Sequence, residues 1–178
     1  APVALIESLS ISRGIVPVSM GQETIGGHMT AETYSGEYGT SDSFGFAGRA
    51  YFGGQSINDG QVGSALLSLA NRNHIFRTFL MHEKGDNSEF PGGTILSSEY
   101  DRDRWDLGYS YQRGSHEFTV DFARNNTLKA GTAALPMDIL ALDSDLFRTK
   151  YEYNGIDYRI TARYSNDDIL HIMSNNQL

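Results

Sequence analysis

The sequence lacks cysteine altogether among its 178 residues, so a disulfide framework and a thiolate metal site are both excluded within it. It has no apolar run of about 18 residues, which excludes a transmembrane helix. The membrane itself is not excluded, because a barrel strand needs only about 10 alternating residues. Basic residues are the minority, with 14 Lys and Arg against 22 Asp and Glu, and the net charge of −8 argues against a general nucleic-acid binder.

What the chain does have is glycine and aromatic residues. Glycine occurs 19 times, tyrosine 10 times and phenylalanine 9 times, a composition that argues against intrinsic disorder. The chain begins at Ala1 without an initiator Met or an apolar leader, and it stops at Leu178 without a tail signal. We therefore expect it to be an excerpt of a longer protein.

Alternation of apolar and polar residues with period two is the clearest pattern, and it predicts strands whose successive side chains point to opposite faces. No segment shows a convincing helical period, so the predicted fold is all-β. Seven strands are predicted, at residues 44–52, 62–69, 75–81, 105–111, 117–122, 147–153 and 156–164.

The connections between these strands alternate in length. Short ones are predicted at residues 70–73 and 112–116, and Asn154-Gly155 is typical of a two-residue hairpin turn. Long polar ones are predicted at residues 53–61, 83–98 and 124–143. Outer-membrane barrels have short periplasmic turns and longer extracellular loops, so the alternation favours a membrane-spanning antiparallel β-barrel.

A soluble antiparallel sheet that packs on one side would show the same alternation, and it remains the alternative. Its core face would favour Val, Ile and Leu, whereas here Tyr recurs near strand ends, where membrane interfaces favour it. The barrel predicts one exposed outer surface that carries Trp105, Leu107, Tyr109, Phe118, Phe122, Tyr151, Tyr158 and Ile160. The opposite face would carry Arg148, Lys150, Glu152, Asp157, Arg159 and Arg163.

The N-terminal region resembles the end of the plug domain of TonB-dependent outer-membrane receptors. In that family a strand runs into Arg-Gly, then Tyr- or Met-Gly, then Ile-Gly-Gly before a last strand. Here the matching segments are Ile-Ser-Arg-Gly at residues 11–14, Ser-Met-Gly at 19–21 and Ile-Gly-Gly-His-Met at 25–29. Residues 44–50 resemble the first barrel strand of these receptors.

The resemblance implies a domain organisation and a function. Residues 1–38 would be the C-terminal part of the plug with its linker, and residues 39–178 the first seven or so strands of a 22-stranded barrel. The protein would be a receptor in the outer membrane of a Gram-negative bacterium that takes up a scarce ligand actively. Its partners would be membrane lipid and the TonB energy-transducing complex, whose contact segment is not in this chain. We expect neither an enzyme nor a nucleic-acid binder.

Two segments resemble the copper-receptor branch of the family: residues 131–139, and His171-Ile172-Met173 followed by Asn176. If the latter is extended, His171 and Met173 project from one face, and an imidazole nitrogen with a thioether sulfur suits Cu(I). Copper would be the transported ligand rather than a catalytic cofactor. The alternative is an exposed His beside a packing Met.

The family's other copper ligands are a Cys-x-x-x-Met pair in the plug, and this chain has no cysteine. Either that pair lies upstream of Ala1 or it has been replaced; Met20, His28 and Met29 are the nearby soft residues, and none matches the motif. A metal chelate, namely a ferric siderophore, is therefore the alternative ligand. A soluble β-sheet binding module is the alternative from another functional class.

Other combinations of His and carboxylate residues fit no known site motif. His82-Glu83 lacks the second His four residues later that a zinc-peptidase helix requires. Asp101-Arg102-Asp103 and Asp143-Ser144-Asp145 lack the glycine turn and distal Glu of a calcium loop. We interpret these residues as solvated carboxylates and a loop histidine.

Overall fold

The computed structural model describes residues 3–15, 26–133 and 137–174, and it divides the chain into two compact units, residues 1–35 and 36–178. The predicted Ser-Met-Gly segment at 19–21, Ile25, part of the segment 131–139 and Asn176 lie outside the described residues. Within the described part, no helix has both the length and the apolar character to cross a membrane. The only helical element described is a single 3-10 turn, Val3–Leu5.

The first unit contains a two-stranded antiparallel sheet of β1 (Ile6–Ser12) and β2 (His28–Thr33). Two glycines of the plug-like motifs have positive φ, 88° at Gly14 and 112° at Gly27, which L side chains rarely adopt. At Gly27 a Cβ atom would also lie 2.5 Å from the carbonyl oxygen of Ser12. Glycine is thus favoured at both positions, after the end of β1 and before the start of β2.

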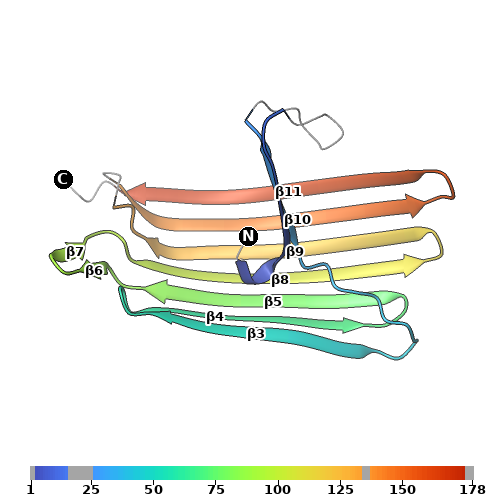
Figure 1. Ribbon diagram of the computed structural model, residues 1–178, viewed down its shortest axis with the longest axis horizontal. Helices are drawn as coiled ribbons and strands as arrows, with labels where there is room; N and C mark the ends of the chain where they lie inside the picture. The colour runs from blue at the N-terminus through green and yellow to red at the C-terminus, as the bar shows by residue number, and fades with distance from the viewer. Residues whose placement is uncertain (1–2, 16–25, 134–136, 175–178) are drawn as a thin grey trace. The chain divides into compact units, whose positions relative to one another are not determined.

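The second unit is a single antiparallel sheet of seven strands in the order β11-β10-β9-β8-β5-β4-β3 (Figure 1). The all-β prediction and the seven strands are therefore confirmed. A small separate hairpin, β6 (Ser88–Phe90) with β7 (Gly93–Ile95), lies between β5 and β8 in the sequence. The large strands are β3 (Gly45–Gln55), β4 (Gly60–Ala70), β5 (His74–Gly85), β8 (Tyr100–Arg113), β9 (His116–Ala130), β10 (Asp138–Asn154) and β11 (Arg159–Ser174).

The strands are longer than predicted, and two of the three predicted long loops are wrong. Residues 53–61 are mostly strand, because Gly53 and Gly54 continue β3 and pair with Val62 and Gln61. Residues 124–130 and 138–143 extend β9 and β10, so β9 ends at Ala130 and β10 begins at Asp138. The longest strand has 17 residues, well above the ~10 that cross a bilayer.

The predicted two-residue turn at Asn154-Gly155 is also wrong. Asn154 is still in β10 and pairs with Arg159, so the turn consists of residues 155–158. It closes with a hydrogen bond from the Gly155 amide to the Tyr158 carbonyl at 2.8 Å. The Asn154 side chain accepts a hydrogen bond from Arg159 Nε at 2.9 Å, which fixes the longer turn.

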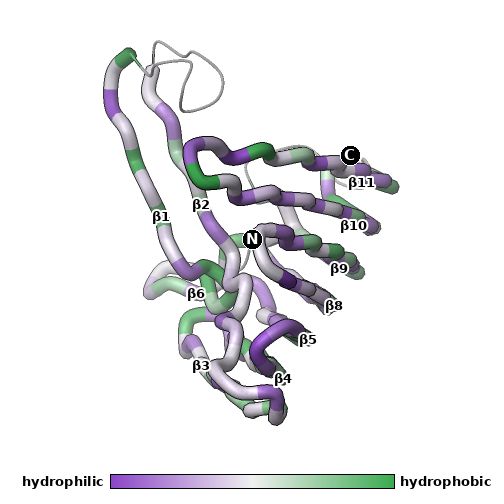
Figure 2. Tube along the Cα trace, turned by 90° about the vertical axis from the view of Figure 1, so that its right-hand side faces the viewer, coloured by the Kyte–Doolittle hydropathy of each residue, from purple (hydrophilic) through white to green (hydrophobic). Residues whose placement is uncertain are grey.

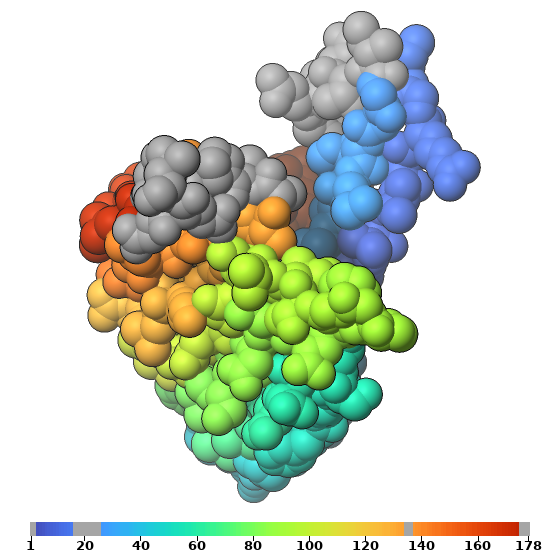
Figure 3. Space-filling view, turned by 90° about the vertical axis from the view of Figure 1, so that its left-hand side faces the viewer, coloured from blue at the N-terminus to red at the C-terminus, as the bar shows by residue number. Residues whose placement is uncertain are grey.

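The connections differ between the two ends of the sheet. One end, the short-turn end, carries the connections 71–73, 114–115 and 155–158. The other end, which we call the long-connection end, carries residues 86–99 with the β6–β7 hairpin (Figure 3). It also carries the short β3–β4 turn at residues 56–59, so the alternation of short and long connections is not strict. Residues 39–42 hydrogen-bond to the β4–β5 turn, with the Gly39 amide donating to the Asn71 carbonyl at 2.9 Å.

The strand register separates an apolar face from a polar face, because paired residues share a face and successive residues alternate. The hydropathy of the trace alternates along the strands accordingly (Figure 2). The predicted aromatic and aliphatic residues share one face, with Tyr158 in the adjoining turn, and none is buried. We define the apolar face by Phe46, Phe52, Leu67, Leu69, Phe76, Leu80, Trp105, Leu107, Tyr109, Phe118, Phe122, Phe147, Tyr151, Ile160 and Tyr164.

On β5, β8, β9 and β10 the large members of the apolar face lie in the half of the sheet next to the short turns. Leu80 and Trp105 are its last large apolar members on β5 and β8; beyond them the same face carries His82 and Asp103. On β9 and β10 it changes similarly to Arg124 and Asp145, which form an ion pair at 2.9 Å. On these four strands a band of apolar surface is thus bounded by charged residues toward the long-connection end, whereas Phe52 on β3 lies level with His82.

The polar face holds the buried core of this unit. Phe79 is 1% exposed, and Leu66 and Ile75 are similarly buried. Gly36 lies against this cluster, since a Cβ atom there would be 2.8 Å from Ile75 Cγ2. The larger apolar side chains of the opposite face stay exposed, as at Phe52, which is 82% exposed.

Candidate functional site

His171 and Met173 both lie on β11, two residues apart and on the polar face of the sheet. The prediction that this segment is extended is confirmed, and their side chains project from the same side of the strand. His171 is exposed and Met173 is half-buried. The strand therefore presents an imidazole and a thioether together at the long-connection end.

The neighbouring strand supplies apolar residues around this pair. His171 is opposite Leu142 and Met173 is opposite Ile139, with a bulge in β10 between residues 139 and 141. Ile169 precedes His171 on the same face. No carboxylate stands opposite either side chain, so the setting favours a soft cation over Ca²⁺ or Mg²⁺, which prefer oxygen ligands.

Arginine and aspartate pair across three strands of the polar face. Arg77 on β5 reaches over Gly108 on β8 and forms an ion pair with Asp121 on β9. A Cβ atom on Gly108 would lie 2.5 Å from Arg77 Nε, so glycine leaves room for this crossing. Arg77 also donates to Ser110 Oγ at 3.0 Å. This ion pair links β5 to β9 across β8, on a face that carries few exposed apolar groups.

A second polar network runs across β8, β9 and β10. Arg104 Nε lies 2.8 Å from Asp106 Oδ1, and Arg104 Nη1 donates to Asn125 Oδ1 at 2.8 Å. The Asn125 amide donates in turn to Ser144 Oγ at 2.9 Å. Near the short turns, Lys150 and Glu152 pair at 2.5 Å. The charges of this face are therefore organised as hydrogen-bonded pairs, as a wet interior surface allows.

The structure also brings together residues that the sequence motifs kept apart. His82 on β5 stands opposite Asp103 on β8, and Asp101 is two residues further along the same face. Within the described ranges, theirs is the one group of three or more His, Cys, Asp or Glu side chains with metal-ligand proximity. The sequence did not predict this group, because its members are on two strands, β5 and β8. The register between these strands depends on how the intervening residues 86–99 fold.

The soft residues of the first unit are not arranged as a pair. His28 and Met29 are adjacent on β2, opposite Ser12 and Ile11 respectively. Adjacent strand residues point to opposite faces, so the two cannot bind one ion there. Met20, the third soft residue of this region, lies outside the described residues.

The comparison with solved structures identifies a similar fold. A structure named copper transporter OprC matches with a TM-score of 0.86 and 17% sequence identity, over 97% of this chain and 27% of that one. The chain thus spans about a quarter of that transporter, and the seven-stranded sheet is a segment of a β-barrel. No protein-family model and no curated protein sequence matches.

Proposed function

We propose that this chain belongs to a TonB-dependent receptor of the Gram-negative outer membrane, which takes up copper ion. The fold it shares with a protein named copper transporter carries the proposal. The His171 and Met173 side chains on one face of β11 support copper as the ligand.

The two faces of the sheet fit this role. The apolar face provides the exposed hydrophobic surface that a lipid bilayer requires, and the ion pairs at its edge match the position of lipid headgroups. The polar face would line the barrel lumen. The first unit, within residues 1–38, would be the end of the plug, and the TonB complex would act on a more N-terminal segment.

Because the chain has no cysteine, experiment must distinguish copper ion from a ferric siderophore as the transported ligand. With the His-x-Met pair as half of a copper site, the other soft ligands must come from elsewhere in the protein. A ferric siderophore would instead need no soft ligands from the protein, because the chelator already satisfies the iron. A transport assay therefore distinguishes copper ion from a ferric siderophore as the ligand.

Copper accumulation in cells tests the proposal. Deleting the gene is expected to abolish high-affinity uptake of radioactive copper at nanomolar concentrations, and restoring it should recover uptake. A proton uncoupler should also stop uptake, since the transport is active. If copper accumulation is unchanged while ferric-siderophore uptake falls, copper is the wrong ligand; if neither depends on the gene, the transport role is wrong.

A further inference from the structure

The structure assigns a second metal site, for a divalent transition-metal ion, to His82, Asp101 and Asp103. This site lies on the opposite face from His171 and Met173, just beyond the apolar band toward the long-connection end. It does not depend on the identity of the transported ligand.

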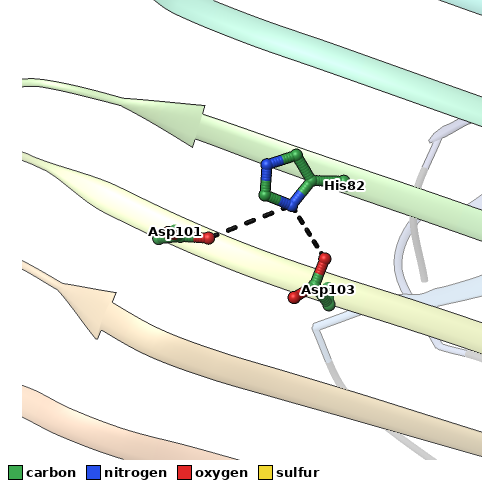
Figure 4. A group of neighbouring side chains, drawn as sticks. All are labelled: His82, Asp101 and Asp103. Atoms are coloured by element: carbon green, nitrogen blue, oxygen red, sulfur yellow. Dashed lines mark hydrogen bonds and ion pairs between the residues drawn. The ribbon is translucent and has the colours of Figure 1, made fainter.

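The three ligand atoms already converge (Figure 4). His82 Nδ1 lies 2.7 Å from Asp103 Oδ1 and 4.0 Å from Asp101 Oδ1, and one ligand atom from each residue lies within 4.8 Å of the others. Ligands about 2.0–2.1 Å from a tetrahedral ion are about 3.3 Å apart. Both distances from His82 are within an ångström of that value, so small side-chain movements would complete the site.

Two adjacent strands hold these side chains in place. His82 and Asp103 are directly opposite each other in the β5–β8 ladder, and Asp101 follows at the spacing that returns to the same face. All three are partly exposed, which leaves room for water molecules as further ligands. Three protein ligands with open positions are typical of accessible zinc sites.

One oxygen atom of the group has no hydrogen-bond partner. Asp101 Oδ1 is buried from solvent and accepts no hydrogen bond, although the rest of the side chain is partly exposed. A buried oxygen without a partner is unfavourable, and a bound cation would satisfy it.

Two lysines stand opposite Asp101 in the ladder, and one of them is engaged elsewhere. Lys129, opposite Asp101 on β9, binds Glu99 at 2.8 Å, and this hydrogen bond holds the pKa of the Glu99 carboxyl below its usual range. Lys84 stands opposite Asp101 on β5. With imidazole and carboxylate ligands, the group suits Zn²⁺ or Cu²⁺ rather than Cu(I), which selects sulfur.

Titration with zinc chloride tests the site separately from copper uptake. We expect calorimetry of the full-length protein in detergent to show one Zn²⁺ site that His82→Gln removes. Asp101→Asn should weaken this site about tenfold or more, because changes to residues behind a metal's ligands already cost this much. The matched control is His116→Gln, which removes an exposed histidine near the short turns of the same face and should leave zinc binding unchanged.

Tryptophan fluorescence gives an independent readout at this position. Trp105 is two residues from Asp103 on the same face, so Ni²⁺ bound to the group should quench the emission that Trp105→Phe removes. His82→Gln should prevent this quenching. Zinc stoichiometry that is the same in wild type and His82→Gln, or Ni²⁺ quenching that persists in His82→Gln, would overturn the assignment.

Discussion

Arginine in place of Leu107 is expected to destabilise the protein in lipid bilayers by about 2–4 kcal/mol, the cost of a lipid-facing charge near the bilayer centre. Leu107 is on β8, the central strand of the sheet, and is 53% exposed within the apolar face. Its ladder neighbours on that face are Thr78 and Phe122. The measurement is the free energy of unfolding by denaturant in phospholipid vesicles.

The same substitution distinguishes the barrel from a soluble sheet. In a soluble module, an exposed leucine changed to arginine would alter stability by no more than about 0.5 kcal/mol. The matched control is Thr161→Arg on the polar face of β11, where the new guanidinium would lie opposite Glu152. The control should leave stability nearly unchanged, and an equally small effect at Leu107 would contradict a lipid-facing surface.

Removing either soft ligand is expected to weaken Cu(I) binding by the full-length protein about 100-fold or more, because changes behind a metal's ligands already cost 10- to 100-fold. The variants are His171→Ala and Met173→Ala, measured by competition with a Cu(I) chelator of known affinity. Both side chains project from the same face of β11, so either substitution by itself should weaken Cu(I) binding.

A neighbouring residue provides the control for copper binding. Ile169→Ala removes an exposed side chain from the same face of the same strand without removing a donor atom. It should leave the Cu(I) affinity unchanged. Wild-type affinity in Met173→Ala would show that the thioether is not a ligand, and wild-type affinity in both variants would remove the pair from the copper site.

The strands were predictable because their pattern is local. Alternation at residues 105–111 and 147–153 fixes which side chains share a face, and consecutive strands of a meander pair with one another. The glycine motifs at Gly14 and Gly27 were equally readable, since positive φ favours glycine wherever it occurs.

The extensions of the strands could not be read in the same way. Residues 124–130 are mainly polar and residues 139–142 are a continuous apolar run, so neither segment shows the alternation that predicts a strand, whereas backbone pairing continues through both. Polar side chains such as those of Arg124 and Asp145 support this pairing through cross-strand ion pairs. The alternation of apolar and polar residues indicates only the strand segments that have one apolar side. The strands themselves extend beyond those segments.

The His82 group was unpredictable for a different reason. Its members are on β5 and β8, and the register between these strands depends on how residues 86–99 fold. Those residues form the β6–β7 hairpin, which no sequence pattern indicated. The His171 and Met173 pair was found because both residues lie on one strand, where spacing alone determines the face.

Spin labels along β11 test the central claim, that the apolar face meets lipid and the polar face meets water. Single labels at residues 160, 162 and 164 and at 161, 163 and 165 would be placed in the full-length protein, in vesicles and in a background without other cysteines. The first set should be accessible to oxygen and protected from a water-soluble nickel chelate, and the second set the reverse. Equal exposure of both sets to the nickel chelate would contradict the membrane placement.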